Sequence, residues 1–246
     1  MDRFFIPQLA DSPMLLLEAS EELHHMTRVL RLKPGAQVEL INGQGVLLTA
    51  EIVSSSGHRV QVRVLQRHSE VSPCAPRIIL ACAVPKRVKF EDIIDKCTQL
   101  GVDEIIPMQT ERTEVLLRGR DTAAKFARFE KVAVAALKQS RRLWMPVVSR
   151  PYEFYEVVQR ISSETLAVIP WLEGDRRGLK DVLGLVPGKK QILILIGPEG
   201  DFSADEVARA MSKGAIPVSL GNNVLRVDTA ASLAVGVFSI LGRQPV

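Results

Sequence analysis

The chain has 246 residues, of which 46% are hydrophobic and 24% are charged, and its formal net charge is +4 at pH 7. These proportions are ordinary for a soluble protein of one large domain or two smaller ones. The longest nearly apolar stretch, residues 230–241, is well short of the roughly 18 residues of a membrane span. The four apolar residues 14–17 are too few for the core of a signal peptide. We therefore expect a cytoplasmic protein with no membrane partner.

The cysteines and histidines argue against metal and disulfide chemistry. The three cysteines show no C-x-x-C spacing, which suggests neither a zinc site nor a disulfide framework. The four histidines all lie in the first 68 residues, away from the C-terminal loops described below. We expect no metal and no histidine-based catalysis there.

The positive charge is concentrated in the middle third of the chain. Residues 76–150 contain 15 lysines and arginines against 9 acids, whereas residues 1–75 and 151–246 are close to neutral. Such a basic segment is consistent with a polyanionic partner. Solvated surface side chains alone would give the same pattern, so both interpretations stay open.

The first 70 residues predict a small all-β module. Turn signals at Pro34-Gly35, Asn42-Gly43 and Ser56-Gly57 separate segments that alternate apolar and polar residues. The expected strands are residues 37–41, 46–53 and 59–65, and we expect a barrel. Two prolines and two serines make residues 69–76 the predicted linker.

Beyond residue 77 the pattern changes to alternating strands and helices. The order predicts a parallel sheet covered by helices, an α/β domain. We expect strands at residues 78–84, 104–108, 165–170 and 191–196, and helices at 88–100, 121–142 and 230–241. The last helix is apolar nearly all round, so it must be buried in the core or against another subunit.

A glycine-rich loop follows the apolar strand at 191–196. Residues 195–207 read L-I-G-P-E-G-D-F-S-A-D-E-V, in which Pro198 fixes its own φ and Gly200 permits a backbone shape that other residues resist. Ser203 and Glu206 form a capping box for the next helix. Backbone N–H groups before a helix often bind phosphate, but Glu199 and Asp201 would repel it, and no P-loop or dinucleotide fingerprint is present. The loop favours a neutral or cationic ligand, with a tight turn that binds nothing as the alternative.

A second loop, I-P-V-S-L-G-N-N-V-L-R-V-D-T-A, spans residues 216–230. It places two apolar side chains, Val224 and Leu225, beside Arg226 and Asp228. An Arg-x-Asp sequence by itself is more often a structural ion pair than a catalytic one. The presence of the first loop in the same chain favours a catalytic role for Arg226 and Asp228.

The two loops together resemble the C-terminal motifs of the SPOUT methyltransferases, which are knotted S-adenosylmethionine (SAM) enzymes. The similarity is strongest to the ribosomal RNA small-subunit methyltransferase E family, which methylates N3 of a uridine, nucleotide 1498 of 16S rRNA. It extends to M-D-R-F-F-I at the start, H-H-M-T-R-V-L-R-L-K-P-G, K-C-T-Q-L-G-V-D-E-I-I-P, T-E-R at 110–112 and K-Q-S-R-R at 138–142. The chain departs from the family pattern at Gln99 and Lys138, where glutamates are common, at Asp201, where a glycine is frequent, and at Val227-Asp228, where Thr-Glu is typical.

The resemblance implies a PUA-like β-barrel over residues 1–70 that binds RNA, followed by a SPOUT α/β domain over 77–246 with a C-terminal trefoil knot. It also implies a homodimer, SAM as the cofactor, and 16S rRNA or the small ribosomal subunit as the partner. The expected cofactor-binding residues are Ile169, Pro170, Ile196, Gly197, Pro198, Glu199, Gly200, Ser219, Leu220, Gly221, Val224 and Leu225.

The expected catalytic residues are Arg226, Glu199 and Asp228. Arg226 would orient the base and stabilise charge on its carbonyl oxygens, while Glu199, Asp201, Asp228 or water would accept the N3 proton. The expected phosphate contacts are Arg3, Arg28, Arg31, Arg112, Lys138, Arg141 and Arg142. The alternatives are methylation of another RNA or of a ribose 2′-hydroxyl, and a non-catalytic RNA-binding assembly factor.

Overall fold

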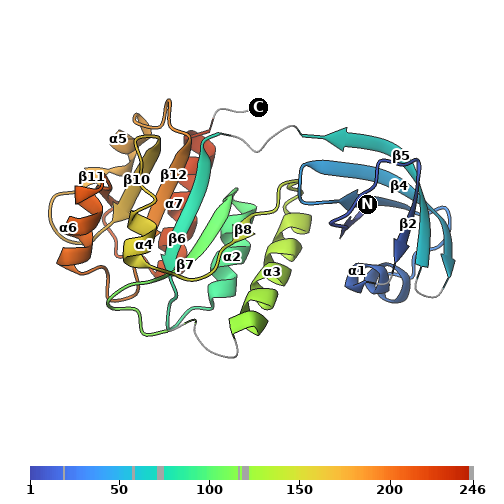
Figure 1. Cartoon of the computed structure of the whole chain (residues 1–246), viewed down its shortest axis with the longest axis horizontal. Helices are drawn as coiled ribbons and strands as arrows, with labels where there is room; N and C mark the ends of the chain where they lie inside the picture. Colours follow the sequence, from blue (N-terminus) through green and yellow to red (C-terminus); the bar gives the residue numbers. More distant parts are fainter. Residues whose placement is uncertain (19, 57–58, 71–74, 116, 118–121, 244–246) are drawn as a thin grey trace. The chain divides into compact units, whose positions relative to one another are not determined.

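The computed structural model describes residues 1–18, 20–56, 59–70, 75–115, 117 and 122–243 (Figure 1). The chain forms two compact units, Met1–Pro73 with Leu137–Met145, and Cys74–Ala136 with Pro146–Val246. The first unit therefore includes a segment, 137–145, that a boundary at residues 69–76 leaves in the second domain. Within that expected linker, residues 71–74 lie outside the described part of the chain.

The first unit contains a five-stranded sheet in the order β1-β3-β4-β5-β2. Its elements are β1 (Asp2–Phe5), β2 (Met14–Glu18), α1 (Glu21–His24), the π-helical turn η1 (His25–Val29), β3 (Gln37–Ile41), β4 (Val46–Ser56) and β5 (Arg59–Ser69). Only β1 and β3 pair in parallel among these neighbours. Register shifts at Thr49/Ala50 and Ile52/Ser54 bend the long β4–β5 pair. Phe4 and Leu15, from the two edge strands, lie in one core cluster, so the curved sheet encloses a single core.

Residues 137–145 join the first unit through apolar packing. Leu137 and Leu143 form a cluster with Ile41 on β3, and Trp144 packs against it. Backbone hydrogen bonds from Gly45 N–H to the Leu143 carbonyl and from the Met145 N–H to the Gly43 carbonyl add to this contact. Such pairing between residues about a hundred positions apart leaves no local signal in the sequence.

The second unit contains a parallel eight-stranded sheet with strand order β11-β13-β10-β12-β6-β7-β8, and β9 also pairs with β7. Its strands are β6 (Arg77–Ala83), β7 (Glu104–Gln109), β8 (Val147–Val148), β9 (Tyr152–Glu153), β10 (Thr165–Pro170), β11 (Arg177–Gly178), β12 (Gln191–Ile196) and β13 (Ile216–Ser219). Its helices are α2 (Phe90–Gln99), α3 (Thr122–Gln139), α4 (Phe154–Val158), α5 (Leu179–Leu183), α6 (Ala204–Ser212) and α7 (Val227–Leu241). The expected α/β architecture is confirmed.

Helices cover both faces of this sheet (Figure 1). Helix α7 contacts β6, β12 and α2, while α4 and α6 share a core cluster with alternate residues of β6, β10 and β12. The strand QILILI is buried on both sides for this reason, which explains why its sequence does not alternate with polar residues.

The helix ends differ slightly from the expected ones. Helix α3 ends at Gln139 instead of residue 142, because Arg141 takes a left-handed conformation (φ 61°) that does not continue a helix. Helix α7 begins at Val227, three residues earlier than expected, and ends at Leu241. Ile240 and Leu241 are 73% and 65% exposed, so the C-terminal end of this apolar helix is not covered within the described chain. No helix of the described residues has the length and apolarity needed to cross a membrane.

Glu104, at the start of β7, anchors a charged cluster inside the second unit. Its carboxylate accepts two hydrogen bonds from Arg160, at 2.9 and 3.0 Å, and one from Ser149 at 2.8 Å. Burial raises the pKa of Glu104, but the bonds from Arg160 and Ser149 and the nearby Arg77 outweigh it, so the pKa lies below the usual 4.5. The carboxylate is therefore a source of stability only while it is ionised.

We expect Glu104→Gln to lower the free energy of unfolding at pH 7 by about 1.5–3 kcal/mol, because it weakens several hydrogen bonds to a buried charge. The stabilisation is complete above pH 4.5 and is lost as the pH falls through the lower pKa of the folded state, so the two proteins should converge in acid. Urea unfolding at several pH values measures this. Glu164→Gln is the control, since its pair with Lys190 is exposed; an equal loss in both variants would contradict the role of burial.

Candidate functional site

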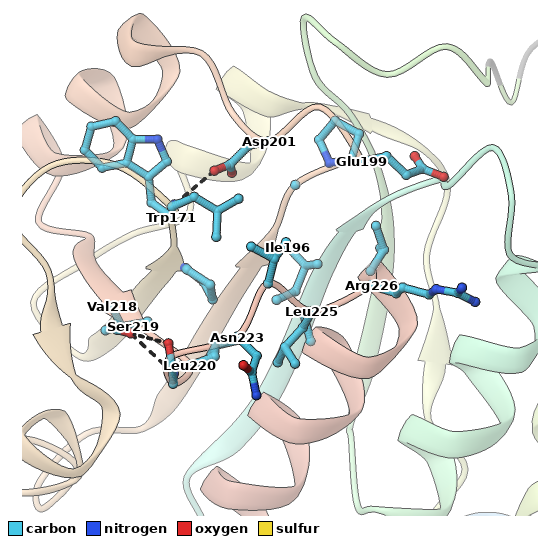
Figure 2. Close-up of a pocket in the computed structure, with 18 of the residues that line it drawn as sticks. Trp171, Ile196, Glu199, Asp201, Val218, Ser219, Leu220, Asn223, Leu225 and Arg226 are labelled. Carbon is cyan, nitrogen blue, oxygen red and sulfur yellow. Dashed lines mark hydrogen bonds between the residues drawn. The ribbon is translucent and has the colours of Figure 1, made fainter.

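A cavity of about 380 Å³ lies at the carboxyl ends of β10, β12 and β13 (Figure 2). Two loops that follow β12 and β13 border it, as does the segment that follows β10. The residues around it are Arg87, Val88, Pro170, Trp171, Leu172, Arg176, Ile196, Gly197, Pro198, Glu199, Asp201, Val218, Ser219, Leu220, Gly221, Asn223, Val224, Leu225, Arg226, Val227 and Ala230. The walls are mainly apolar, with backbone and a few polar groups at the edges, as in most small-molecule sites.

The loop after β12 is tightly packed against its own helix. A Cβ atom at Gly197 would approach the ring of Phe202 to 3.1 Å, which explains the glycine there. The expected capping box is confirmed, because the Ser203 hydroxyl accepts from the Glu206 N–H and the Glu206 carboxylate accepts from the Ser203 N–H. The left-handed residue of the loop is Asp201 (φ 59°), and Gly200 is not left-handed. The expectation that Gly200 provides the unusual backbone shape is therefore wrong.

Glu199 joins the loop to the segment after β6. Its Oε1 accepts hydrogen bonds from the backbone N–H groups of Lys86 (2.8 Å) and Arg87 (3.1 Å). Burial raises the pKa of Glu199, but these hydrogen bonds, a bond from its own N–H and the charge of Arg87 outweigh it and lower the pKa below 4.5. Glu199 is thus an ionised group at the edge of the cavity, and its Oε2 accepts no bond from another described residue.

The loop after β13 turns at Gly221. The Ser219 hydroxyl accepts from the Gly221 N–H and donates to the Gly221 carbonyl, and Gly221 has a φ of 123°, which a side chain would strain. Val224 is 77% exposed and Leu225 is half-buried beside the cavity. In Figure 2, Leu225 and Ile196 lie at the centre of the pocket.

Arg226 is the N-cap residue of α7 and borders the cavity. Its side chain is exposed and extends to the same side of the pocket as Glu199, opposite Trp171 (Figure 2). Its guanidinium makes no hydrogen bond or ion pair with another residue that the structure describes. Within the described part of the chain, Arg226 is therefore a cation without a protein partner at the edge of the cavity.

Asp228 occupies a different place from the expected one. It does not border the cavity but forms an ion pair with Lys96 of α2, at 3.0 Å. The hydrogen bond from Lys96 lowers the pKa of Asp228. An Arg226–Asp228 ion pair, the alternative to a catalytic role, does not form, because side chains two positions apart at a helix start point in different directions.

Most of the expected cofactor-binding residues border the cavity: Pro170, Ile196, Gly197, Pro198, Glu199, Ser219, Leu220, Gly221, Val224 and Leu225. Two do not. Ile169 points into the hydrophobic core, one position before the strand end, and Gly200 has its carbonyl turned to Arg112. Only the strand-end residues Ile169 and Pro170 were expected on this side of the site, and no residue of Trp171–Arg176 was. The available signal was the turn glycine Gly174, four residues after the end of the buried strand β10.

The expected RNA contacts divide into residues at the surface of the first unit and residues that form defined pairs within the protein. Arg28, Arg31 and Arg141 are exposed, and Arg31 and Arg141 have left-handed backbones. Arg142 is half-buried and also interacts within the protein.

Three other expected RNA contacts have partners within the protein. The Arg3 side chain is 9% exposed and paired with Glu39 at 2.8 Å. Lys138 pairs with Glu22 at 2.5 Å. Arg112 donates to the Gly200 carbonyl at 2.7 Å and so supports the first loop. No group of three or more metal-ligating side chains occurs among the residues that the structure describes.

Comparison with known proteins identifies the family of both units. A family model described as an RNA methyltransferase domain matches residues 72–239, and one described as an RNA methyltransferase PUA domain matches residues 17–65. Relatives named ribosomal RNA small subunit methyltransferase E include those of Synechocystis sp. (32% identity, 95% of this chain and 77% of the relative) and Bacillus subtilis (29% identity, 97% and 96%).

Solved structures of similar proteins agree with these matches. A putative methyltransferase from Legionella pneumophila in complex with SAM has a TM-score of 0.85 and 31% identity, covering 96% of this chain and 95% of that one. Ribosomal RNA small subunit methyltransferase E from Neisseria gonorrhoeae, bound to SAM, has a TM-score of 0.85 and 25% identity, covering 97% and 96%. The fold is that of an RNA methyltransferase with a PUA-like domain. The chain belongs to the ribosomal RNA small subunit methyltransferase E family.

Proposed function

We propose that the protein transfers a methyl group from SAM to N3 of a uridine in the small-subunit rRNA, nucleotide 1498 of 16S rRNA. The observation that carries the proposal is a largely apolar cavity, bordered by the two family loops, with the unpaired Arg226 and the ionised Glu199 together on one side.

The cavity fits SAM in size and chemistry. Its volume lies in the range of about 300–1,000 Å³ that is usual for small-molecule sites. Ile196, Leu220 and Leu225 would form apolar walls for the adenine, and the backbone of the two loops would hold the polar groups. Glu199 is compatible with a sulfonium cation, whereas it would repel a phosphate. The SAM complexes of the Legionella and Neisseria relatives support this assignment.

SAM supplies an activated methyl group for an in-line displacement, so alignment of the base contributes much of the acceleration. Arg226 would donate to a uracil carbonyl oxygen and stabilise the negative charge that develops when the N3 proton leaves. Of the three carboxylates considered for that proton, Asp228 is paired with Lys96 and does not border the cavity, and both Asp201 oxygens accept backbone N–H groups. Glu199, with its Oε2 still available, is the acceptor that the geometry favours.

The methylated nucleoside tests the function directly. Purified protein, SAM and small ribosomal subunits from a strain that lacks this gene should yield 3-methyluridine at one position, which nucleoside mass spectrometry identifies. Methylation of a ribose 2′-hydroxyl or of another RNA would contradict the proposed site, and no methylation despite SAM binding would contradict the activity on this substrate.

The RNA surface that we propose in the first unit consists of Arg28, Arg31, Arg141 and Arg142. For a phosphate contact, replacement by alanine should flatten the slope of log affinity against log salt by about one unit per charge. We expect this for Arg28→Ala and for Arg141→Ala in RNA-binding titrations. Arg67→Ala, which removes a cation paired with Asp11, is the matched control; an equal change in its slope would contradict the assignment.

Three further features of the family stay predictions for this chain: the trefoil knot, the homodimer and a cytoplasmic location. Three exposed apolar side chains of α7, Leu233, Ile240 and Leu241, support a homodimer, since a second copy would remove them from water. Sedimentation equilibrium tests that association.

A further inference from the structure

Asp201 is the residue of the first loop that the family resemblance explains least, because glycine is frequent there. Its left-handed backbone (φ 59°) accounts for the frequency of glycine, which has no Cβ to strain. An aspartate at this position bears some strain, which its side-chain bonds offset. Both oxygens of the Asp201 carboxylate accept hydrogen bonds.

The two bonds of the Asp201 carboxylate go to different loops. Oδ1 accepts the N–H of Phe202 at 2.8 Å, within its own loop. Oδ2 accepts the N–H of Leu172 at 3.0 Å, in the segment after β10 (Figure 2). A single side chain therefore joins two loops that border the same cavity.

The segment that Asp201 holds is compact and is anchored at both ends, because Trp171 packs against the core cluster and β11, which follows Arg176, pairs with β13. Trp171 packs over Gly174, where a Cβ would lie 2.6 Å from its ring, and the Trp171 carbonyl accepts from Arg176 at 3.0 Å. Near its start the Trp171 N–H donates to the Val218 carbonyl at 3.3 Å, so Leu172 lies between this bond and the β11–β13 pairing. Trp171, Leu172 and Arg176 all border the cavity, yet Leu172 is 50% exposed.

We infer that Asp201 is a positioning residue that latches the Trp171–Arg176 segment onto the first loop and so holds Leu172 against the bound cofactor. The inference rests on the proposed cofactor site. Asp201 acts through the Leu172 backbone, so it sets how long the cofactor stays bound and does not take part in methyl transfer. A glycine in its place keeps the shape of the loop but cannot accept the hydrogen bond from the Leu172 N–H.

The test compares Asp201→Gly, Leu172→Ala and the double variant in calorimetric titrations with SAM and with S-adenosylhomocysteine, its uncharged thioether product. Asp201→Gly loses both carboxylate hydrogen bonds, and the loss of the one to the Leu172 N–H should raise the dissociation constant about tenfold. The rise should be equal for both ligands, because the latch does not act through charge. The rate constant for methyl transfer at saturating SAM should not change, since glycine is unstrained at this φ and keeps the shape of the loop.

The double variant shows whether Asp201 acts through Leu172. If it does, the double variant should bind no more weakly than the weaker of the two single variants, whereas independent effects would multiply. Asp205→Ala, an exposed acid on α6 that does not border the cavity, is the control.

Three results would overturn the inference: unchanged affinity in Asp201→Gly, an effect on SAM alone, and multiplicative effects in the double variant. Absence of SAM binding by the wild-type protein would instead refute the proposed cofactor site.

Discussion

Replacement of Arg226 by alanine should lower the single-turnover rate of methyl transfer about 100–1,000-fold, the usual cost of removing one donor to a developing negative charge. The dissociation constant of SAM should not change measurably. The two expectations differ because the Arg226 guanidinium lies beside the cavity on the side of Glu199 and extends away from Ile196 and Leu225, which would contact the cofactor.

The prediction is checked by rapid-quench assays with small ribosomal subunits and by calorimetric titration with SAM. Arg209→Ala is the matched control, because Arg209 is an exposed arginine of the same unit that does not border the cavity. A folded Arg226→Ala protein with wild-type turnover would refute the role in charge stabilisation. A large loss of SAM affinity would place Arg226 in the cofactor site instead.

Glu199→Gln separates two roles of one side chain: holding the segment after β6 and accepting the N3 proton. The glutamine oxygen can still accept the Lys86 and Arg87 N–H groups, so we expect SAM binding to persist. It cannot accept a proton, and loss of a general base typically lowers the rate by about 100-fold or more. Glu199→Ala should lose both SAM affinity and the rate of methyl transfer, because the segment after β6 is no longer held.

The pH dependence follows from the lowered pKa of Glu199. A proton acceptor must be ionised, and this carboxylate remains ionised until the pH falls below 4.5. The wild-type rate should therefore show no loss from this group between pH 5 and neutrality in single-turnover measurements. Wild-type turnover in Glu199→Gln would mean that Glu199 serves only as a structural clamp.

Local sequence signals predicted many of the elements that build the site. The strand at 191–196, the capping box of Ser203 and Glu206, and the strand at 165–170 all agree with the structure. These signals act within a few residues, through hydrophobic periodicity and helix capping. The same reasoning failed at Gly200, because composition marks a glycine but not which neighbour takes the left-handed conformation.

Side-chain partners distant in the sequence were not predictable in this way. Lys138 was expected to contact RNA, but it lies against Glu22, 116 positions earlier. Asp228 was expected to act in catalysis, but Lys96, 132 positions away, holds it outside the cavity. Arg112 supports the Gly200 carbonyl across 88 positions. Each pairing depends on which strands and helices become neighbours, and no local pattern encodes that order.

The sequence by itself therefore determined the two loops that follow buried strands, their apolar and acidic character, and the family to which the chain belongs. The tertiary structure decided the rest: the third side of the pocket at Trp171–Arg176, the clamp from Glu199 to the segment after β6, and the latch at Asp201. The physical reason is that a parallel sheet brings the carboxyl ends of β10, β12, β13 and β6 to one edge. Loops from distant parts of the chain meet there, and their contacts exist only once the sheet has formed.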